Sequence, residues 1–144
     1  MMLKVESFNP SHIDKLNAVE GDKEVIEFAD FYRAEGIIEA IAIIDENDDV
    51  VVVCGGAELW RGVCEVWLLK SDLFYKYSRQ CAKIIKKHLD EGFNRCDYHR
   101  VQASCSKDSK EQSRWLEWLG FENEGVLRKY GLNGEDYIMH ARIK

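Results

Sequence analysis

The chain has 144 residues, enough for one ordinary domain that buries roughly 70% of the surface its unfolded form exposes. Apolar residues make up 46% of the sequence and charged residues 32%, a mixture that excludes both a disordered tail and a membrane-embedded protein. The net charge of −6 excludes the overall positive field that attracts proteins to nucleic acid.

The first quarter of the chain is predicted to form a strand and two helices. Lys4 to Phe8 alternates in polarity as a short strand does. A helix is expected to begin at Pro10 and Ser11, with Ser11 as its N-cap. From Asp22 to Glu35 apolar residues recur at helical spacing, which predicts a second helix.

The centre of the chain is predicted to consist of strands. Ile37 to Ile44 and Val50 to Ala57 are β-branched apolar runs, and the polar segment Asp45 to Asp49 between them has the length of a hairpin turn. Val63 to Leu69 predicts a further strand. This strand carries a single carboxylate, Glu65, inside an apolar run, and that residue is the first one in the chain that suggests chemistry.

The second half begins with a long amphipathic helix, predicted over Lys76 to Phe93 with its end near Gly92. Arg100 to Cys105 alternates in polarity and predicts a strand with Val101, Ala103 and Cys105 on one face.

The C-terminal part predicts one more helix and a hairpin. Asp108 is expected to start the helix and Gly120 to close it. Two strands follow, over Gly125 to Tyr130 and Asp136 to Ile143, with Asn133-Gly134 suited to a tight turn between them. The predicted order is therefore β-α-α-β-β-β-α-β-α-β-β, an α/β (α+β) arrangement.

The C-terminal motifs resemble those of the GNAT superfamily of acyl-CoA N-acyltransferases. The sequence R-W-L-E-W-L-G-F at residues 114–121 is similar to the family's last helix with its Leu-Gly-Phe ending, and E-G-V-L-R-K-Y at 124–130 to its E-G-x-x-R-x-Y strand. The element order extends the resemblance over about residues 3–143, and the motifs cover residues 63–139. The tail and residues 65–72 are also similar to small GNAT-like proteins of tailed phages.

The resemblance implies a single domain over residues 1–144, with a mixed, mostly antiparallel central sheet flanked by helices. It also implies that acetyl-CoA lies in a gap between the fourth and fifth strands, with its pyrophosphate on the amides that start the following helix. The residues that match this cofactor-binding region are Leu69, Ser71, Lys76, Ser78, Arg79 and Gln80.

The phosphate loop departs from the family pattern. Two positions that are glycine in the family fall on Arg79 and Cys81, and their side chains are expected to narrow the phosphate cradle. Positive charge from Lys76 and Arg79 is expected to compensate for the lost glycines.

Glu65 matches the position at which many family members carry the catalytic base. A carboxylate on an apolar strand is partly desolvated, as a base that works near neutral pH requires. The family's general acid, a tyrosine, would fall at Leu116 and is missing. Tyr130 and Tyr137 are candidate substitutes, although tyrosines at such positions are more often sheet-packing residues.

Other motifs carry less information. Cys96-x-x-His99 is half of a metal pair without a second half, so no metal site is expected. Gly55-Gly56 inside an apolar strand indicates a bulge or a close backbone approach. Trp67 and Trp115 are interpreted as core residues. The five cysteines lack C-x-x-C spacing and are interpreted as buried thiols of a reducing compartment.

Two functions of different classes fit these observations. One is an acetyl-CoA-dependent N-acetyltransferase that acts by direct attack of an amine on a small molecule or a protein. The other is a GNAT-shaped binding or phage virion-associated protein that has lost catalysis. The N-terminus has no secretory signal, so a cytoplasmic location is expected, in the host if a phage encodes the chain. Neither nucleic acid nor membrane is an expected partner, and the oligomeric state is left open, a homodimer included.

Overall fold

The computed structural model describes residues 2–18, 37–95 and 97–144 of the chain. The helix expected from Asp22 to Glu35 lies outside the described residues. In chain order the described elements are β1 (Lys4–Ser7), α1 (Pro10–Lys15), β2 (Ile37–Ile44), β3 (Val50–Trp60), β4 (Val63–Lys70), α3 (Leu73–Lys76), α4 (Ser78–Arg95), β5 (Arg100–Ser106), α5 (Lys110–Trp118), β6 (Glu122–Leu127) and β7 (Tyr137–Ile143).

The described strands form one seven-stranded sheet in the order β1-β2-β3-β4-β5-β7-β6. Neighbouring strands are antiparallel except β4 and β5, which run parallel. A parallel pair needs a crossover, and α3 and α4 supply it. The sheet is therefore mixed and mostly antiparallel, as expected. Within the described residues no helix is long and apolar enough to cross a bilayer.

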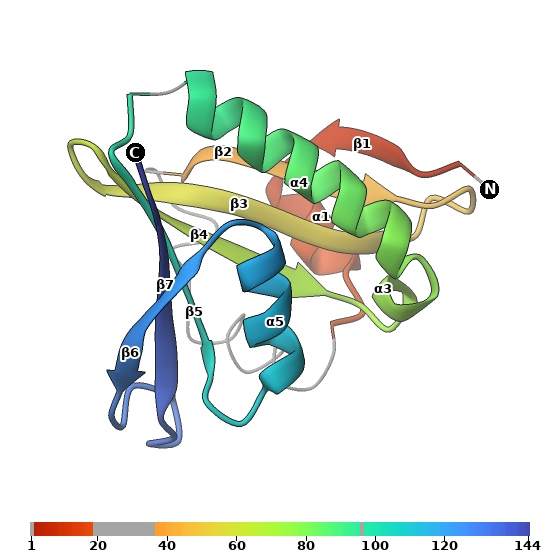
Figure 1. Cartoon of the computed structure of the whole chain (residues 1–144). Coiled ribbons are helices and arrows are strands. Elements are labelled where there is room, and N and C mark those ends of the chain that lie inside the picture. The colour runs from red at the N-terminus through yellow and green to blue at the C-terminus, as the bar shows by residue number, and fades with distance from the viewer. Residues whose placement is uncertain (1, 19–36, 96) are drawn as a thin grey trace.

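Helices cover both faces of the sheet (Figure 1). On one face α1 buries Ile13 against a cluster that includes Leu69 of β4. On the other face α4 buries Cys81 against the strands, and α5 buries Leu116 in a cluster with Ala103 of β5. α4 and α5 thus cover one face of the parallel pair β4 and β5, and α1 packs against β4 on the other face.

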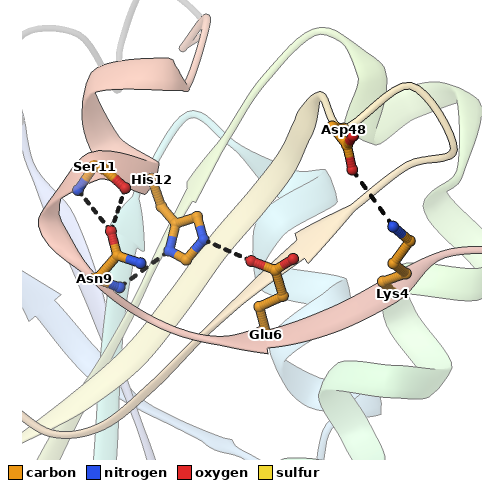
Figure 2. A network of polar contacts seen from close by, with 6 residues as sticks. All are labelled: Lys4, Glu6, Asn9, Ser11, His12 and Asp48. Carbon is orange, nitrogen blue, oxygen red and sulfur yellow. Dashed lines mark hydrogen bonds and ion pairs between the residues drawn. The ribbon is translucent and has the colours of Figure 1, made fainter.

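The start of α1 corrects the predicted cap. Asn9, not Ser11, is the N-cap: its side chain accepts a hydrogen bond from the Ser11 amide at 2.9 Å, and Nδ1 of His12 accepts one from the Asn9 amide at 3.0 Å (Figure 2). Pro10 occupies the first turn, where its missing N–H costs nothing. The cap therefore has to be the residue before the proline. Nε2 of His12 lies 3.2 Å from Glu6 of β1, which ties the helix to the first strand (Figure 2).

The long helix differs from its prediction at both ends. It is divided at Tyr77, a buried residue whose amide donates to the carbonyl of Leu73 and so closes α3 before α4 begins. At the other end α4 passes through Gly92 and continues to Arg95. Phe93 anchors this last turn: it is buried, and the guanidinium of Arg142 lies 4.5 Å from its ring centroid. Tertiary packing here outweighs the low helix propensity of glycine.

The C-terminal elements also differ in detail from the prediction. Ser109, not Asp108, caps α5 by accepting a hydrogen bond from the Gln112 amide at 3.3 Å. β6 begins at Glu122 and ends at Leu127, so residues 128–136 form a longer connection than the expected tight turn. The hydrogen bonds within this connection run from the amide of Gly131 to Glu135 and from that of Gly134 back to Gly131. Gly120 closes α5 as predicted, with a φ of +97° that favours glycine.

The cysteine side chains lead to a chemical prediction. Burial raises the pKa of the Cys81 thiol to about 11, and burial together with the nearby Cys81 raises that of Cys54 to about 12. A thiol that stays protonated at pH 8 is a poor nucleophile. Iodoacetamide at pH 8 is therefore expected to leave Cys54 and Cys81 unmodified in the folded protein and to alkylate both in urea, as measured by peptide mass spectrometry. Rapid alkylation of Cys54 in the folded protein would contradict this burial.

Candidate active site

The two parallel strands separate part-way along their length. Their paired positions are Val63 with Arg100, Cys64 with Val101 and Glu65 with Gln102. Beyond the last of these pairs β4 and β5 run apart (Figure 1). α3 lies beside the carboxyl end of β4, and α5 lies beside β5 (Figure 1). The parting of the strands, on which the predicted site depends, is therefore present.

Glu65 stands at the last paired position of β4, and a second side chain fixes its orientation. Its Oε1 accepts a hydrogen bond from Nε2 of Gln102 at 3.3 Å. Oε1 of Gln102 in turn accepts from Nε of Arg100 at 2.8 Å. An arginine side chain can only donate hydrogen bonds, so Gln102 must direct its carbonyl oxygen at Arg100. The NH₂ group of Gln102 therefore faces Glu65.

Arg100 is held by a carboxylate on β6. Its Nη2 lies 2.6 Å and its Nη1 3.1 Å from the oxygens of Glu124, a bidentate pair. This hydrogen bonding raises the pKa of the Arg100 guanidinium and lowers that of the Glu124 carboxyl. A chain of polar contacts therefore runs from Glu124 through Arg100 and Gln102 to Glu65.

Tyr130 lies in the connection between β6 and β7 and is more than half exposed. Partial burial raises the pKa of the Tyr130 hydroxyl, the charge of Glu65 raises it further, and Ser104 acts in the opposite direction. The ring centroid of Tyr130 lies 5.4 Å from that of Tyr137. The Tyr130 hydroxyl thus stays protonated at neutral pH.

The start of α4 has the features of an anion site. Ser78, Arg79 and Gln80 form its first turn, and all three are exposed. The first amides of a helix lack intrahelical acceptors and carry a partial positive charge. The first turn of α4 contains no acidic residue that would occupy this charge.

Solved structures of N-acetyltransferases match this fold over nearly the whole chain. A GNAT-family acetyltransferase from Bacillus anthracis has a TM-score of 0.71 at 14% identity, with 99% of this chain and 95% of that chain covered. This chain has the GNAT fold. A chimera of the spermidine N-acetyltransferase of Vibrio cholerae has a TM-score of 0.74 at 14% identity, with 99% of this chain and 96% of that chain covered. The ribosomal-protein-S5-alanine acetyltransferase of Vibrio fischeri has a TM-score of 0.72 at 14% identity, with 99% of this chain and 93% of that chain covered. No family model matches the sequence, and no curated protein is similar to it.

The residues matched to the GNAT cofactor region divide into two groups. Leu69 and Ser71 are buried: Leu69 belongs to the core on the α1 side, and the hydroxyl of Ser71 donates to the carbonyl of Val51 at 2.8 Å. Their side chains hold the end of β4 in place. Lys76 and the first turn of α4 are exposed, with Nζ of Lys76 5.3 Å from the Tyr77 ring centroid.

Cys81 corrects the expectation of a narrowed phosphate cradle. It is fully buried in the core cluster beneath α4, so its side chain points away from the start of the helix. Because α4 begins at Ser78, Cys81 stands one turn inside the helix on its sheet-facing side. Of the two positions that are glycine in the family, only Arg79 has its side chain at the exposed start of the helix.

The side of the gap covered by α5 is apolar. Leu116, at the position of the family's tyrosine, is buried in the cluster beneath α5. Trp115 packs edge-to-face on Phe74 of α3, with ring centroids 6.2 Å apart, and so joins the two helices across the end of the sheet. Trp67 packs against the core on the opposite face. The interpretation of Trp67 and Trp115 as core residues is confirmed.

Gly56 lies on β3, next to β4, at a position where a larger residue would clash with β4. A Cβ at this position would lie 2.8 Å from Sγ of Cys64 and 3.6 Å from the carbonyl oxygen of Glu65. The short contact is with a side chain of β4, so Gly56 accommodates Cys64 rather than the expected bulge or close backbone approach.

Gln102, Ser104 and Arg100 are site residues that the sequence analysis did not single out. They occupy the positions of β5 that alternate with the buried Val101 and Ala103, so the alternation itself placed them on one face. What the sequence lacked was the register that sets Gln102 opposite Glu65. Cys96 lies outside the described residues, and among those described no group of three or more metal-ligating residues occurs.

Proposed function

We propose that this protein is an acetyl-CoA-dependent N-acetyltransferase that transfers the acetyl group to an amine by direct attack, with Glu65 as the base. The observation that carries the proposal is the end of β4–β5 pairing at Glu65 and Gln102. There a half-buried carboxylate stands at the point where the two strands part. The GNAT fold and an acid-free helix start with Arg79 support the same conclusion.

Glu65 would remove a proton from the acceptor as the amine nitrogen bonds to the acetyl carbonyl carbon. The carbon–sulfur bond then breaks, and coenzyme A leaves as a thiolate that takes a proton from solvent. A thiolate of ordinary acidity can leave without an acid catalyst, which is consistent with a leucine at position 116. The exposed Ser78, Arg79 and Gln80 would bind the pyrophosphate through their amides and the guanidinium.

Thermal melting with acetyl-CoA tests this proposal. A ligand at 100 times its Kd stabilises the folded state by about 2.7 kcal/mol, so we expect Tm to rise by several degrees for a domain of this size. Sodium acetate and sodium pyrophosphate at equal concentration serve as controls and should produce a much smaller rise.

An unchanged Tm at millimolar acetyl-CoA would reject the proposal. The alternative, a GNAT-fold binding or virion-associated protein without catalysis, would then be favoured. The altered phosphate loop and the buried Leu116 are the observations that favour this alternative.

A further inference from the structure

Arg100 of β5 stands between two carboxylates that lie on opposite sides of its strand. In the sheet order β4-β5-β7-β6, Glu65 belongs to the neighbouring strand on one side, and Glu124 belongs to β6, two strands away on the other side. The guanidinium forms its bidentate pair with the farther one, Glu124. Within the part of the chain that the structure describes, no ion pair involves Glu65. The arginine is therefore directed away from the candidate base.

Arg100 is nevertheless close enough to Glu65 to pair with it. Arg100 and Gln102 are two residues apart on β5, so their side chains share one face of the sheet. Gln102 is in turn paired with Glu65 of β4. Arg100 and Glu65 are thus diagonal neighbours, with Cα atoms about 8 Å apart, a distance that two long side chains can bridge.

Gln102 occupies the space between Arg100 and Glu65. Its carbonyl oxygen accepts from Nε of Arg100 at 2.8 Å, and its NH₂ group donates to Glu65 at 3.3 Å. Glutamine is neutral, so it gives Glu65 a hydrogen bond without a positive charge. A carboxylate that is paired with a guanidinium is stabilised in its charged form and accepts a proton less readily. A neutral partner is therefore better suited to a base than a cation would be.

A bulge in β6 directs Glu124 toward Arg100. The register of β6 with β7 shifts between Asn123 and Gly125, which leaves Glu124 as the extra residue. Gly125 has a φ of +125°, a conformation that favours glycine, and its amide donates to Oδ1 of Asn123 at 2.8 Å. Bulges commonly redirect a side chain in this way. The glycine after Glu124 thus permits the backbone conformation that presents this carboxylate.

We propose that Glu124 is a positioning residue: it draws Arg100 toward β6 and so keeps this cation from pairing with Glu65. Gln102 then remains the neutral hydrogen-bond donor to Glu65. That Glu65 acts as a base rests on the function proposed above. The placement of Arg100 does not rest on that function and can be measured by itself.

The placement of Arg100 is tested by nuclear magnetic resonance without acetyl-CoA. In ¹⁵N-labelled protein the Nε–H signal of Arg100 is assigned by its loss in Arg100→Lys. Glu65→Gln is then introduced into the wild type and into Glu124→Lys, which removes the partner of Arg100 and repels the guanidinium from β6. We expect Glu65→Gln to shift the Arg100 signal farther in the Glu124→Lys background, because only there does Arg100 contact Glu65 directly.

The effect on the proposed base is measured as a rate. Glu124→Lys is expected to lower kcat about 10- to 100-fold, which corresponds to one charge-assisted hydrogen bond that must be broken. The Kd of acetyl-CoA should stay within about twofold of the wild type, because the phosphates do not contact this part of the sheet. Glu124→Gln, which removes the partner without adding a charge, should act in the same direction. Since the ion pair is partly exposed, with 25% and 39% of its side chains accessible, both variants are expected to fold.

A second substitution separates positioning from a merely structural role. Arg100→Gln, added to Glu124→Lys, removes the misdirected cation and is expected to raise kcat again about fivefold or more. An ion pair that only held β5 and β6 together would be lost in both proteins, so the double variant would then be no faster. Glu117→Lys is the matched control: it makes the same charge change at an exposed position of α5, on the opposite face of the sheet, and should keep the wild-type kcat.

The positioning role would be overturned by an equal response of the Arg100 signal to Glu65→Gln in both backgrounds. It would also be overturned by a double variant as slow as Glu124→Lys, or by an equal loss of rate in Glu117→Lys. If acetyl-CoA neither raises Tm nor reacts, the transferase is rejected and the Arg100 signal alone decides the placement. If acetyl-CoA binds and reacts while the Arg100 signal responds equally in both backgrounds, the transferase is kept and the role of Glu124 is rejected.

Discussion

Glu65→Gln is expected to lower the rate of acetyl transfer by about 10²- to 10⁴-fold, the usual contribution of a positioned general base. The amide has the shape of the carboxylate but cannot accept the proton of the acceptor amine. Its carbonyl oxygen can still accept the hydrogen bond from Gln102, now 3.3 Å from Glu65. The local structure is therefore expected to persist, and the acetyl-CoA affinity to stay within about twofold of the wild type.

The measurement is the release of coenzyme A thiol with whichever amine gives the highest rate, alongside acetyl-CoA binding by calorimetry. Glu58→Gln is the matched control: Glu58 is an exposed carboxylate on β3, paired with Cys64 next to Glu65. It undergoes the same loss of charge on a neighbouring strand and should retain nearly full activity. Equal losses in the two variants would indicate a general charge effect, and an unchanged rate in Glu65→Gln would remove this residue from the mechanism.

The strands were predictable because their sequence carries a local signal. Ile37 to Ile44 is a β-branched apolar run bounded by polar residues, and β2 has these bounds. Glu65 could be singled out for a similar reason, since an isolated carboxylate in an apolar strand is conspicuous without any knowledge of its neighbours.

The partners of Glu65 depend on contacts that no local pattern contains. Gln102 lies 37 positions after Glu65 in the chain. Crossover helices connect the two parallel strands, so the sequence does not determine which residues of β4 and β5 are paired. Tyr130 belongs to an irregular connection whose path is set by its own turn hydrogen bonds. The polar contacts around Glu65 could therefore be assigned only from the structure.

The expected narrowing of the phosphate cradle was wrong for Cys81, which the resemblance had placed at a glycine position of the phosphate loop. Its burial in the core agrees instead with the interpretation of the cysteines as buried thiols. The predicted helix from Lys76 is divided by the buried Tyr77, which moves the start of α4 to Ser78. The break depends on the burial of Tyr77 against the sheet, which is a tertiary effect.

Arg79→Glu is expected to raise the Kd of acetyl-CoA by about 10- to 100-fold. Arg79 is exposed in the first turn of α4, where its charge adds to the partial positive charge of the helix start. Reversing the charge removes a charge-assisted hydrogen bond worth about 1.5–3 kcal/mol and places a carboxylate beside the pyrophosphate. Calorimetric titration at low and at 0.5 M salt measures the effect, which should shrink as salt screens the exposed charges.

Lys87→Glu is the control, since Lys87 is exposed on the same helix eight residues further along. At a rise of 1.5 Å per residue this position is about 12 Å from Arg79 along the helix, beyond the Debye length of about 8 Å at physiological ionic strength. The substitution changes the net charge by the same amount but should leave the Kd within about twofold. If both variants lose affinity equally, the attraction is a property of the whole surface, and the start of α4 has no special part in binding the phosphates.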